Sequence, residues 1–451
     1  MSQDIRIKKG LNIKLKGKAE KTLSDLPRTK VYAIKPTDFH GIVPKLTVKA
    51  GDKVQAGDIL FYSKTNEKVK FAAPVSGEIL EITRGAKRRI LDVRITADSK
   101  DSFKDFGKKD PLKLSKEEIS THLSDAGCFP YMIQRPYDII ADPNDTPKAI
   151  FISSFSTAPL AADEAFALQG EEEAFQTGIN ALSKLTDGKI HLSVDANTKS
   201  FFNETTNVDL HKVYGKHPAG NVGVQIASID PINQGDRVWT IKPQDVAIIG
   251  RLFLTGHYDA TRIIAFAGSE VENPRYIKTK QGVKIEDLYN KCIVSTAQEM
   301  RIINGDVLSG KWVRKNNFLG FYNTLISVIP EGNYYTFFGW MPFTQNRIFS
   351  MSRTFFSWLT PNKEYTLDTN LNGEDRAMVM TGEMEAVFPM DIYPMQLLKA
   401  TLVSDIEKME NLGIYEVAPE DFALIDYTSS SKVEAQAIIR EGLDLMIKEV
   451  G

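Results

Sequence analysis

The chain has 451 residues, of which 42% are hydrophobic and 25% are charged, and its formal net charge is −2. This composition is that of an ordinary soluble globular protein, and the length suits roughly three or four domains. A net charge so close to zero creates no overall field that would draw the protein onto polyanions. We therefore expect no nucleic-acid partner.

The cysteines and histidines show no ligand spacing. Only Cys128 and Cys292 are present, far apart in the sequence, whereas an iron–sulfur cluster usually needs about four cysteine thiolates. The six histidines match no zinc motif, so we predict no metal site. Residues 1–17 lack the apolar core of a signal peptide, and no apolar run approaches the roughly 18 residues that span a bilayer. The sequence predicts neither a signal peptide nor a transmembrane helix.

Short β runs separated by Gly-Asp turns fill residues 48–82, which predicts a compact antiparallel domain over residues 1–104. The pattern is that of a biotinyl- or lipoyl-carrier hammerhead. In a carrier, the modified lysine lies on the hairpin that corresponds here to residues 64–68, and Glu67 takes its position. Lys68 is one residue away, and a shift of one residue turns a strand side chain to the opposite face. We favour an unmodified structural module over a swinging arm.

A polar, lysine-rich linker is expected at residues 100–116, followed by an α/β domain at 115–268. The alternation of strands and helices predicts a Rossmann-like layered domain with a parallel sheet. In chain order the expected elements are a strand at 149–153, a helix at 171–185, a strand at 190–194, a helix at 244–255 and a strand at 262–266.

A dinucleotide-binding turn needs glycines so that backbone amides can approach the pyrophosphate. The loop at 154–163, which follows the first of these strands, contains none. The glycine-rich stretch at 215–223 has the wrong spacing. We therefore expect this domain to bind no NAD.

The segment 126–133 is apolar and aromatic. One interpretation, which the sequence alone favours, is a loop that enters the core. The other is one wall of an apolar small-molecule pocket.

The remaining chain divides into three predicted regions. Residues 269–330 suit a small β-grasp (SLBB-like) module with a strand, turn and strand at 301–308, and residues 376–451 suit a helical C-terminal domain from about Pro394. The last helix is expected to begin with a capping box of Ser431 and Glu434. Its apolar stripe consists of Ile438, Ile439, Leu445 and Met446.

Residues 331–375 form an aromatic-rich insertion, whose rings are Tyr334, Tyr335, Phe337, Phe338, Trp340, Phe343, Phe349, Phe355, Phe356 and Trp358. Two interpretations are open. The rings are exposed and mark a docking surface, or they are buried within a β-rich insertion. Lipid insertion is the weaker form of the first, because no clean basic amphipathic helix is present. No catalytic triad, carboxylate pair or phosphate-binding loop can be argued anywhere, so we predict no catalytic residue.

Taken together, these segments resemble the NqrA family, the A subunits of the Na⁺-translocating NADH:quinone reductases. Its wider relatives are the RnfC protein of the Rnf complex and the flavoprotein subunit of complex I. The most specific matches are the opening Ile5-Lys8-Gly10-Leu11 with Leu15-Lys16-Gly17, the hammerhead at 48–60, Ala73-Pro74-Val75-Ser76-Gly77, the run at 124–136, and the tail from Ser430 to Leu443.

The wider relatives bind flavin or NADH at a glycine-rich loop and carry cysteine-rich cluster motifs. At the matching positions, Gly127-Cys128-Phe129-Pro130 retains few glycines, and residues 415–431 contain no cysteine. The resemblance therefore implies a subunit that binds no cofactor, covalently or by motif. It implies that NADH, the flavins and the iron–sulfur centre belong to other subunits.

The resemblance also implies a function. The chain would be a peripheral subunit on the cytoplasmic face of the bacterial inner membrane, in a complex that oxidises NADH, reduces ubiquinone and moves Na⁺ outward. Its partners would be the other subunits, including membrane-embedded ones, and it would not be catalytic alone. If it contacts quinone, we expect Phe129, Tyr131, Met132 and Phe155 to do so. The alternatives are a stand-alone flavin- or NADH-binding oxidoreductase and a purely structural scaffold subunit.

Overall fold

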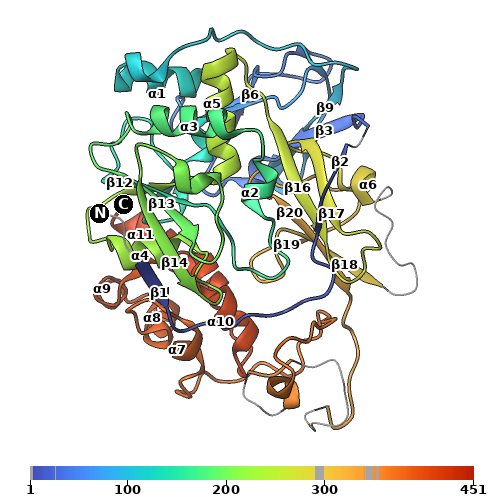
Figure 1. The fold of residues 1–451 in the computed structure, drawn as a ribbon, viewed down its shortest axis with the longest axis vertical. Helices are drawn as coiled ribbons and strands as arrows, with labels where there is room; N and C mark the ends of the chain where they lie inside the picture. Colours follow the sequence, from blue (N-terminus) through green and yellow to red (C-terminus); the bar gives the residue numbers. More distant parts are fainter. Residues whose placement is uncertain (1–3, 26, 290–298, 340, 342–348, 352–354) are drawn as a thin grey trace.

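The strands of this computed structural model form four sheets (Figure 1). The structure describes residues 4–25, 27–289, 299–339, 341, 349–351 and 355–451. Among these residues, no helix is both long and apolar enough to cross a membrane.

Two small sheets build the N-terminal β domain and enclose an apolar core. One contains β3 (Val31–Ile34), β9 (Ile90–Ala97), β8 (Gly77–Arg84) and β5 (Lys53–Val54), and the other contains β4 (Pro44–Leu46), β6 (Ile59–Ser63) and β7 (Lys70–Ala72). The buried rings of Phe61 in β6 and Phe71 in β7, which pair across one sheet, stack at 4.5 Å. Both sheets are antiparallel, as predicted, but β1 (Asp4–Ile7) and β2 (Glu20–Asp25) of the predicted span 1–104 pair in other sheets.

The seven-stranded sheet has a parallel centre. In spatial order it contains β1 (Asp4–Ile7), β14 (Asp209–Gly215), β13 (Ile190–Asp195), β12 (Ala149–Ser153), β15 (Val238–Thr240), β10 (Ile133–Arg135) and β11 (Ile139–Ile140). The first five strands are parallel, and the last two are antiparallel additions. The strands predicted at 149–153 and 190–194 both form here.

Helices cover both faces of this sheet. Ile150 and Ile152 of β12 belong to the core that α3 (Glu172–Leu182) and α5 (Pro243–Thr255) share. The alternate residues, Ala149 and Phe151, pack with α4 (Val222–Ile229) on the opposite face. This placement follows from the two-residue period of a strand. Two further helices are α1 (Lys116–Asp125) and α2 (Glu164–Ala167).

The six-stranded sheet contains β19 (Lys311–Val313), β18 (Met300–Asn304), β20 (Leu325–Pro330), β16 (Thr261–Ala267), β17 (Arg275–Lys280) and β2 (Glu20–Asp25). The strand predicted at 262–266 therefore exists but lies here rather than in the parallel sheet. Residues 306–308 form a turn, in which the Asp306 carboxylate accepts from the Leu308 N–H, and not the predicted second strand. Helix α6 (Ile285–Tyr289) follows β17.

The N-terminal residues join two domains. Strand β1 forms one edge of the seven-stranded sheet, and β2 pairs with β17 at one edge of the six-stranded sheet. The chain reaches the N-terminal β domain only after completing both edges.

The C-terminal part is helical, with α7 (Glu383–Val387), α8 (Pro394–Leu402), α9 (Ile406–Asn411), α10 (Ala423–Thr428) and α11 (Ala435–Glu449). The predicted capping box is wrong. The Asp426 carboxylate instead accepts from the backbone N–H of Ala435 and Gln436, and the Ser431 hydroxyl donates to the carbonyl of Ala377. The apolar stripe does face the core, since Ile439 and Met446 are buried.

Short 3₁₀ turns lie at Pro36–Asp38, Ala86–Arg88, Pro111–Lys113, Phe129–Tyr131, Phe201–Glu204, Phe356–Leu359, Ile414–Glu416 and Pro419–Phe422.

Candidate functional site

The order in which the chain adds strands to the parallel sheet reverses at β12. From this strand the chain proceeds to β13 and β14 on one side and to β15 on the other. Ligands of open α/β sheets bind outside the carboxyl ends of the strands at such a point. The loop at 154–163 and the starts of the helices that follow β14 and β15 are therefore the first place to look for a site.

The side chains at the end of β12 are bonded within the protein. The Ser153 hydroxyl lies 2.9 Å from the Phe155 carbonyl and 3.0 Å from the Gly220 carbonyl. The buried Gln225 amide donates to the Ser153 hydroxyl at 2.9 Å and to the carbonyl of Ala219 at 3.0 Å. These hydrogen bonds join β12 to α4.

The glycine-rich stretch at 215–223 packs against the loop that follows β12. The Gly220 N–H donates to the Thr157 hydroxyl at 2.9 Å, and that hydroxyl lies 3.2 Å from Nδ1 of His217. A Cβ on Gly220 would lie 2.6 Å from the Thr157 nitrogen, so this glycine serves a close contact between two loops. Burial lowers the pKa of His217 to about 4.

Each helix that begins along this edge has a carboxylate of the protein at its N-terminus. Asp163 caps α2 by accepting from the Phe166 N–H at 3.0 Å. Asp245 lies in the first turn of α5. Asp421, from the C-terminal region, lies against α4, where a Cβ on Gly223 would come within 2.6 Å of both of its carboxylate oxygens. Negative charge is favourable at these helix ends, which are the usual place for a bound phosphate.

The three carboxylates differ in their partners. Asp163 forms a 2.6 Å ion pair with Lys21, and its pKa is low despite partial burial because Lys21 and the Phe166 N–H stabilise the charge. Burial raises the pKa of Asp245, although this carboxylate accepts a hydrogen bond from the fully buried Arg262. Burial raises the pKa of Asp421 to about 7.

Arg135 of β10 connects the sheet to the C-terminal region. Its guanidinium is buried, donates to the Glu420 carboxylate at 2.7 Å and lies 3.5 Å from the Asp421 carboxylate. The Ala418 N–H donates to Asp421 at 2.9 Å. These contacts fix Asp421 at the start of α4.

The four residues predicted to contact quinone do not form one wall. Phe129, Tyr131 and Met132 are buried in the main core, each at most 1% exposed. Phe155 packs in a separate small cluster with Val213. Quinone contact by these residues stays a prediction.

Tyr131 belongs to a buried polar group that the sequence did not reveal. Its hydroxyl lies 2.6 Å from the Tyr258 hydroxyl and 3.1 Å from Oε1 of Gln281. The guanidinium of Arg262 lies 5.7 Å from the centre of its ring. The only signal in the sequence was Arg262, a charged residue at the start of the otherwise apolar strand predicted at 262–266. Its position could have indicated that this strand meets a buried polar group.

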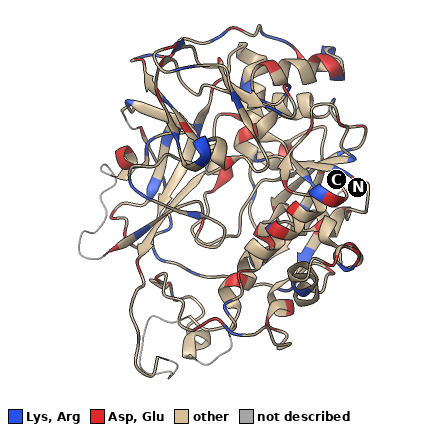
Figure 2. Ribbon diagram, turned by 180° about the vertical axis from the view of Figure 1, so that it is seen from behind, with Lys and Arg blue, Asp and Glu red and all other residues tan. Residues whose placement is uncertain are grey.

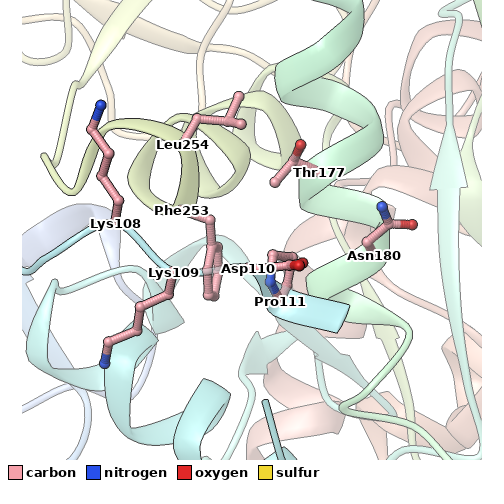
Figure 3. Close-up of a pocket in the computed structure, with 8 residues that line it drawn as sticks. All are labelled: Lys108, Lys109, Asp110, Pro111, Thr177, Asn180, Phe253 and Leu254. Atoms are coloured by element: carbon pink, nitrogen blue, oxygen red, sulfur yellow. The ribbon is translucent and has the colours of Figure 1, made fainter. Parts of the chain in front are cut away.

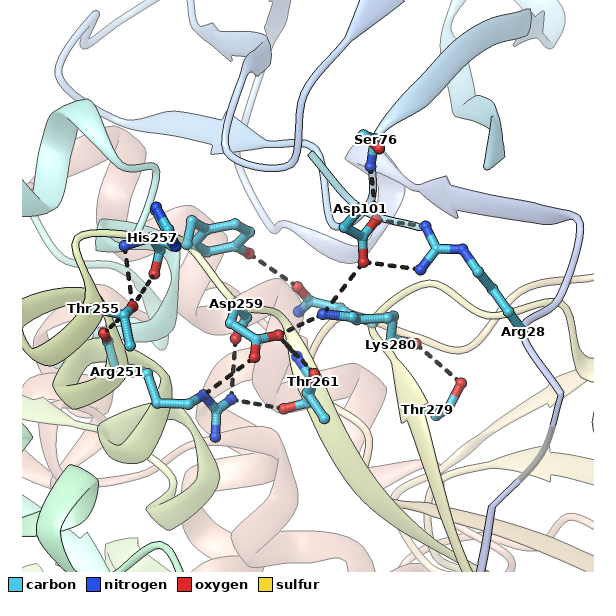
Figure 4. Close-up of polar contacts among 12 residues, drawn as sticks. Arg28, Ser76, Asp101, Arg251, Thr255, His257, Asp259, Thr261, Thr279 and Lys280 are labelled. Atoms are coloured by element: carbon cyan, nitrogen blue, oxygen red, sulfur yellow. Dashed lines mark hydrogen bonds and ion pairs between the residues drawn. The ribbon is translucent and has the colours of Figure 1, made fainter. Parts of the chain in front are cut away.

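A polar junction joins the three domains (Figure 4). Asp101 accepts from Arg28 at 2.8 Å and from the Ser76 N–H at 3.0 Å, and it lies 3.6 Å from the ammonium of Lys280. Lys280 also pairs with Asp259 at 2.5 Å. The start of the predicted linker is therefore anchored at Asp101.

The hairpin that would carry a cofactor is docked on the α/β domain. Asn66 donates to Asp142 at 2.9 Å, and Lys68 donates to Asn144 at 2.6 Å. Glu67 is exposed, with its carboxylate 3.9 Å from the Lys45 ammonium.

A surface hollow of about 340 Å³ lies beside α3 and α5 (Figure 3). It is lined by Lys108, Lys109, Asp110, Pro111, Thr177, Asn180, Phe253 and Leu254. None of the residues predicted for a site lies among them.

No cluster of three or more potential metal ligands occurs among the described residues. Burial raises the pKa of Cys128, and Cys292 lies outside the described residues. The structure therefore identifies no metal centre within the part it describes.

Three family models match the chain. They describe an NqrA N-terminal barrel-sandwich hybrid domain at residues 5–98, an NqrA second alpha/beta domain at 114–258 and an NQRA C-terminal (SLBB) domain at 263–315.

The curated relatives match over nearly their whole length. The A subunit of the Na(+)-translocating NADH-quinone reductase of Neisseria meningitidis serogroup B is 37% identical over 99% of this chain and 100% of the relative. Its counterpart from Rhodopirellula baltica is 34% identical over 98% of both chains. Among solved structures, an NAD+-reducing [NiFe]-hydrogenase in its H2-reduced state matches at 11% identity with a TM-score of 0.35, over 48% of this chain and 49% of that chain. On the matches to the family models and to these full-length relatives, the chain belongs to the NqrA family, the A subunits of Na(+)-translocating NADH-quinone reductases.

Proposed function

We propose that this chain is a peripheral subunit, without a redox cofactor of its own, of a complex that couples NADH oxidation and ubiquinone reduction to outward Na⁺ transport. The names of the relatives support the complex and its reaction. In this proposal the chain lies on the cytoplasmic face of the inner membrane, and other subunits bind NADH, the flavins and the iron–sulfur centre. The α/β domain is Rossmann-like in architecture and serves assembly.

One observation carries the cofactor-free part of the proposal. The three helices that begin at the carboxyl edge of the parallel sheet already hold Asp163, Asp245 and Asp421. A phosphate group placed there would have to displace these carboxylates, which already pair with Lys21, Arg262 and Arg135. Flavin mononucleotide and NADH both carry such phosphates.

The hammerhead supports the same conclusion by a different route. A swinging arm needs a hairpin that leaves the body of the protein. Here two side-chain hydrogen bonds, from Asn66 and Lys68, hold the hairpin on the neighbouring domain. The hammerhead is therefore a structural module in this proposal.

The test is an absorbance spectrum of the purified chain, followed by calorimetric titration with flavin mononucleotide and with NADH. We expect no visible flavin band and no saturable heat. A flavin band near-stoichiometric with protein would instead favour the stand-alone oxidoreductase.

The assembly part needs a separate experiment. An affinity tag on a neighbouring subunit should retain this chain when membranes are solubilised in mild detergent. A chain that never co-purifies with any such subunit would contradict the proposed role.

A further inference from the structure

The chain between β1 and β2, residues 8–19, is called here the lysine strap. It contains no acidic residue and five lysines, which are Lys8, Lys9, Lys14, Lys16 and Lys18. The chain as a whole carries 56 basic and 58 acidic residues, and over the rest of the molecule blue and red segments are interspersed in Figure 2. The strap therefore concentrates a positive charge that the overall composition does not reveal.

Buried and exposed residues alternate in the second half of the strap. Ile13, Leu15 and Ala19 belong to the hydrophobic core that also contains the buried residues of the C-terminal helices. The exposed residues between them include Lys14, Lys16 and Lys18. Because the apolar side chains attach the strap to the protein, the lysines between them face solvent.

Backbone hydrogen bonds fix the strap in place. The Tyr365 N–H donates to the Lys14 carbonyl at 2.8 Å, and the Lys16 N–H donates to the Tyr365 carbonyl at 3.0 Å. The Gly268 N–H donates to the Gly17 carbonyl at 2.8 Å. In Figure 1 the strap is the dark blue segment that crosses the lower half of the molecule between β1 and β2. Its lysines are therefore presented from an anchored backbone.

The lysines of the strap have no carboxylate partner among the residues that the structure describes. Lys14 donates to the amide oxygen of Asn362 at 3.2 Å, which is a neutral group. The other four form no ion pair with a described residue. The next lysine along the chain, Lys21, does form one, with Asp163 at 2.6 Å. Unpaired like charges repel one another, and a negatively charged surface would relieve that repulsion.

The residue types favour anionic lipid headgroups over a protein as the occupant. All five charges are lysines, whereas protein interfaces are enriched in arginine and depleted in lysine. The apolar residues of the strap are buried or partly buried, so they offer no apolar centre for a protein interface. A cluster of about four to eight basic residues beside a membrane is typical of binding to anionic lipids. The lysine ammonium suits this role because it acts as a point charge without a fixed bonding geometry.

The strap borders the aromatic-rich insertion through its pairing with Tyr365. Of the two interpretations left open for that insertion, exposure holds for Tyr335, which is fully exposed, and for Phe337, which is 85% exposed. Trp340 and Phe343 lie outside the described residues. The surface argued here includes no part of the insertion.

We propose that the lysine strap docks this chain on the anionic phospholipid headgroups of the membrane surface. The inference deepens the proposed function, because it names the surface that faces the bilayer in a peripheral subunit. The attraction is electrostatic and needs no insertion, since the apolar side chains of the strap stay in the core. Salt weakens it, because exposed charges are screened beyond about 10 Å at 0.1 M ionic strength.

The test measures binding of the purified chain to vesicles of phosphatidylglycerol mixed with phosphatidylcholine, with pure phosphatidylcholine vesicles as the neutral reference. The strap variant is Lys14→Gln, Lys16→Gln and Lys18→Gln. The matched control removes three exposed lysines of the N-terminal β domain that also form no ion pair with a described residue, namely Lys49→Gln, Lys53→Gln and Lys64→Gln. We expect the strap variant to bind anionic vesicles about tenfold or more weakly, because each lysine near such a surface contributes about fivefold. The control should bind as wild type does.

Further measurements keep the outcomes distinct. Arginine at the same three strap positions should preserve binding, and all variants should unfold at the wild-type urea midpoint. Equal vesicle binding by wild type and strap variant would overturn the inference, as would equal binding of wild type to anionic and neutral vesicles. A strap variant that binds vesicles normally but no longer co-purifies with a tagged neighbouring subunit would assign the strap to an acidic protein surface instead. A wild-type chain that binds vesicles but never co-purifies would refute the proposed function and leave this inference intact.

Discussion

The carboxylate of Asp421 lies so close to Gly223, in the first turn of α4, that a Cβ at this glycine would stand 2.6 Å from both carboxylate oxygens. The contact joins the C-terminal region to the α/β domain, and Asp421 is only 2% exposed. The two residues come from elements far apart in the sequence, so the contact tests whether the C-terminal region is docked as described.

Gly223→Ala should destabilise the protein. Alanine favours a helix over glycine by about 1 kcal/mol, but the buried carboxylate would have to move. Overpacking of this kind typically costs about 1–3 kcal/mol, so we expect a net loss in the free energy of unfolding, measured by urea denaturation. The control is the same substitution in an Asp421→Ala background, where the clash is absent. A Gly223→Ala cost that is unchanged in that background would contradict the contact.

Gly250→Ala should separate two helices. A Cβ at Gly250 of α5 would lie 1.7 Å from the carbonyl oxygen of Ala174 in α3, and one at Gly178 would lie 2.2 Å from the carbonyl oxygen of Val246. Because both obstacles are backbone, relief requires the helices to move apart. We expect a loss of about 1–3 kcal/mol or more in unfolding free energy, measured by chemical denaturation. A matched control is Gly51→Asn, at a positive φ with open space, which should cost little.

The pH dependence of stability should include a contribution from His217. Burial lowers its pKa from 6.5 to about 4. Between those values the unfolded chain binds more protons than the folded chain. This contribution is therefore complete above pH 6.5, and it is lost as the pH falls toward 4. Its size is on the order of 3 kcal/mol.

His217→Asn should flatten the stability curve between pH 6.5 and 4, as measured by denaturation at a series of pH values. The opposite sign applies to Asp421, whose pKa is raised from 3.8 to about 7, so its contribution falls as the pH rises over that interval. The contribution of His217 is therefore obtained as the difference in unfolding free energy between wild type and variant at each pH. Parallel curves for the two proteins would show that His217 titrates normally in the folded state.

The sequence predicted elements whose signals are local. The buried strand Ala149–Ser153 follows from its own apolar run, and α5 ends as expected at Gly256, which adopts a positive φ of 78°. The strand predicted at 262–266 exists as β16, but its residues do not specify its partners. It pairs with β17 and β20 in the six-stranded sheet and not in the parallel sheet.

The failures have one physical cause, which is competition from distant residues. The local pattern at Ser431 and Glu434 satisfied a capping box, yet the helix begins at Ala435, and the carboxylate of Asp426 accepts from the N–H groups of Ala435 and Gln436. The burial of Arg262 against Asp245 depends on a contact between β16 and α5 that no spacing rule encodes. For the same reason the candidate edge could be located from the strand order, but the carboxylate of Asp421 there could not be predicted.

Truncating the side chains predicted to contact quinone should lower the free energy of unfolding, whether or not quinone binds there. Phe129 and Met132 are each at most 1% exposed, and Phe129 meets Trp239 edge-on at 6.1 Å. Phe129→Ala should therefore cost about 3–5 kcal/mol of unfolding free energy, since it leaves a cavity in a packed core. Urea denaturation measures this loss. A cost below about 1 kcal/mol would show that the ring lines a space that solvent or a ligand can enter, which would favour the pocket.

The matched comparison is Phe155→Ala, in the small separate cluster, where truncation of a partly exposed ring should cost less unfolding free energy. Quinone titration is then best made with Phe129→Leu, which preserves most of the buried volume and keeps loss of binding distinct from loss of the fold.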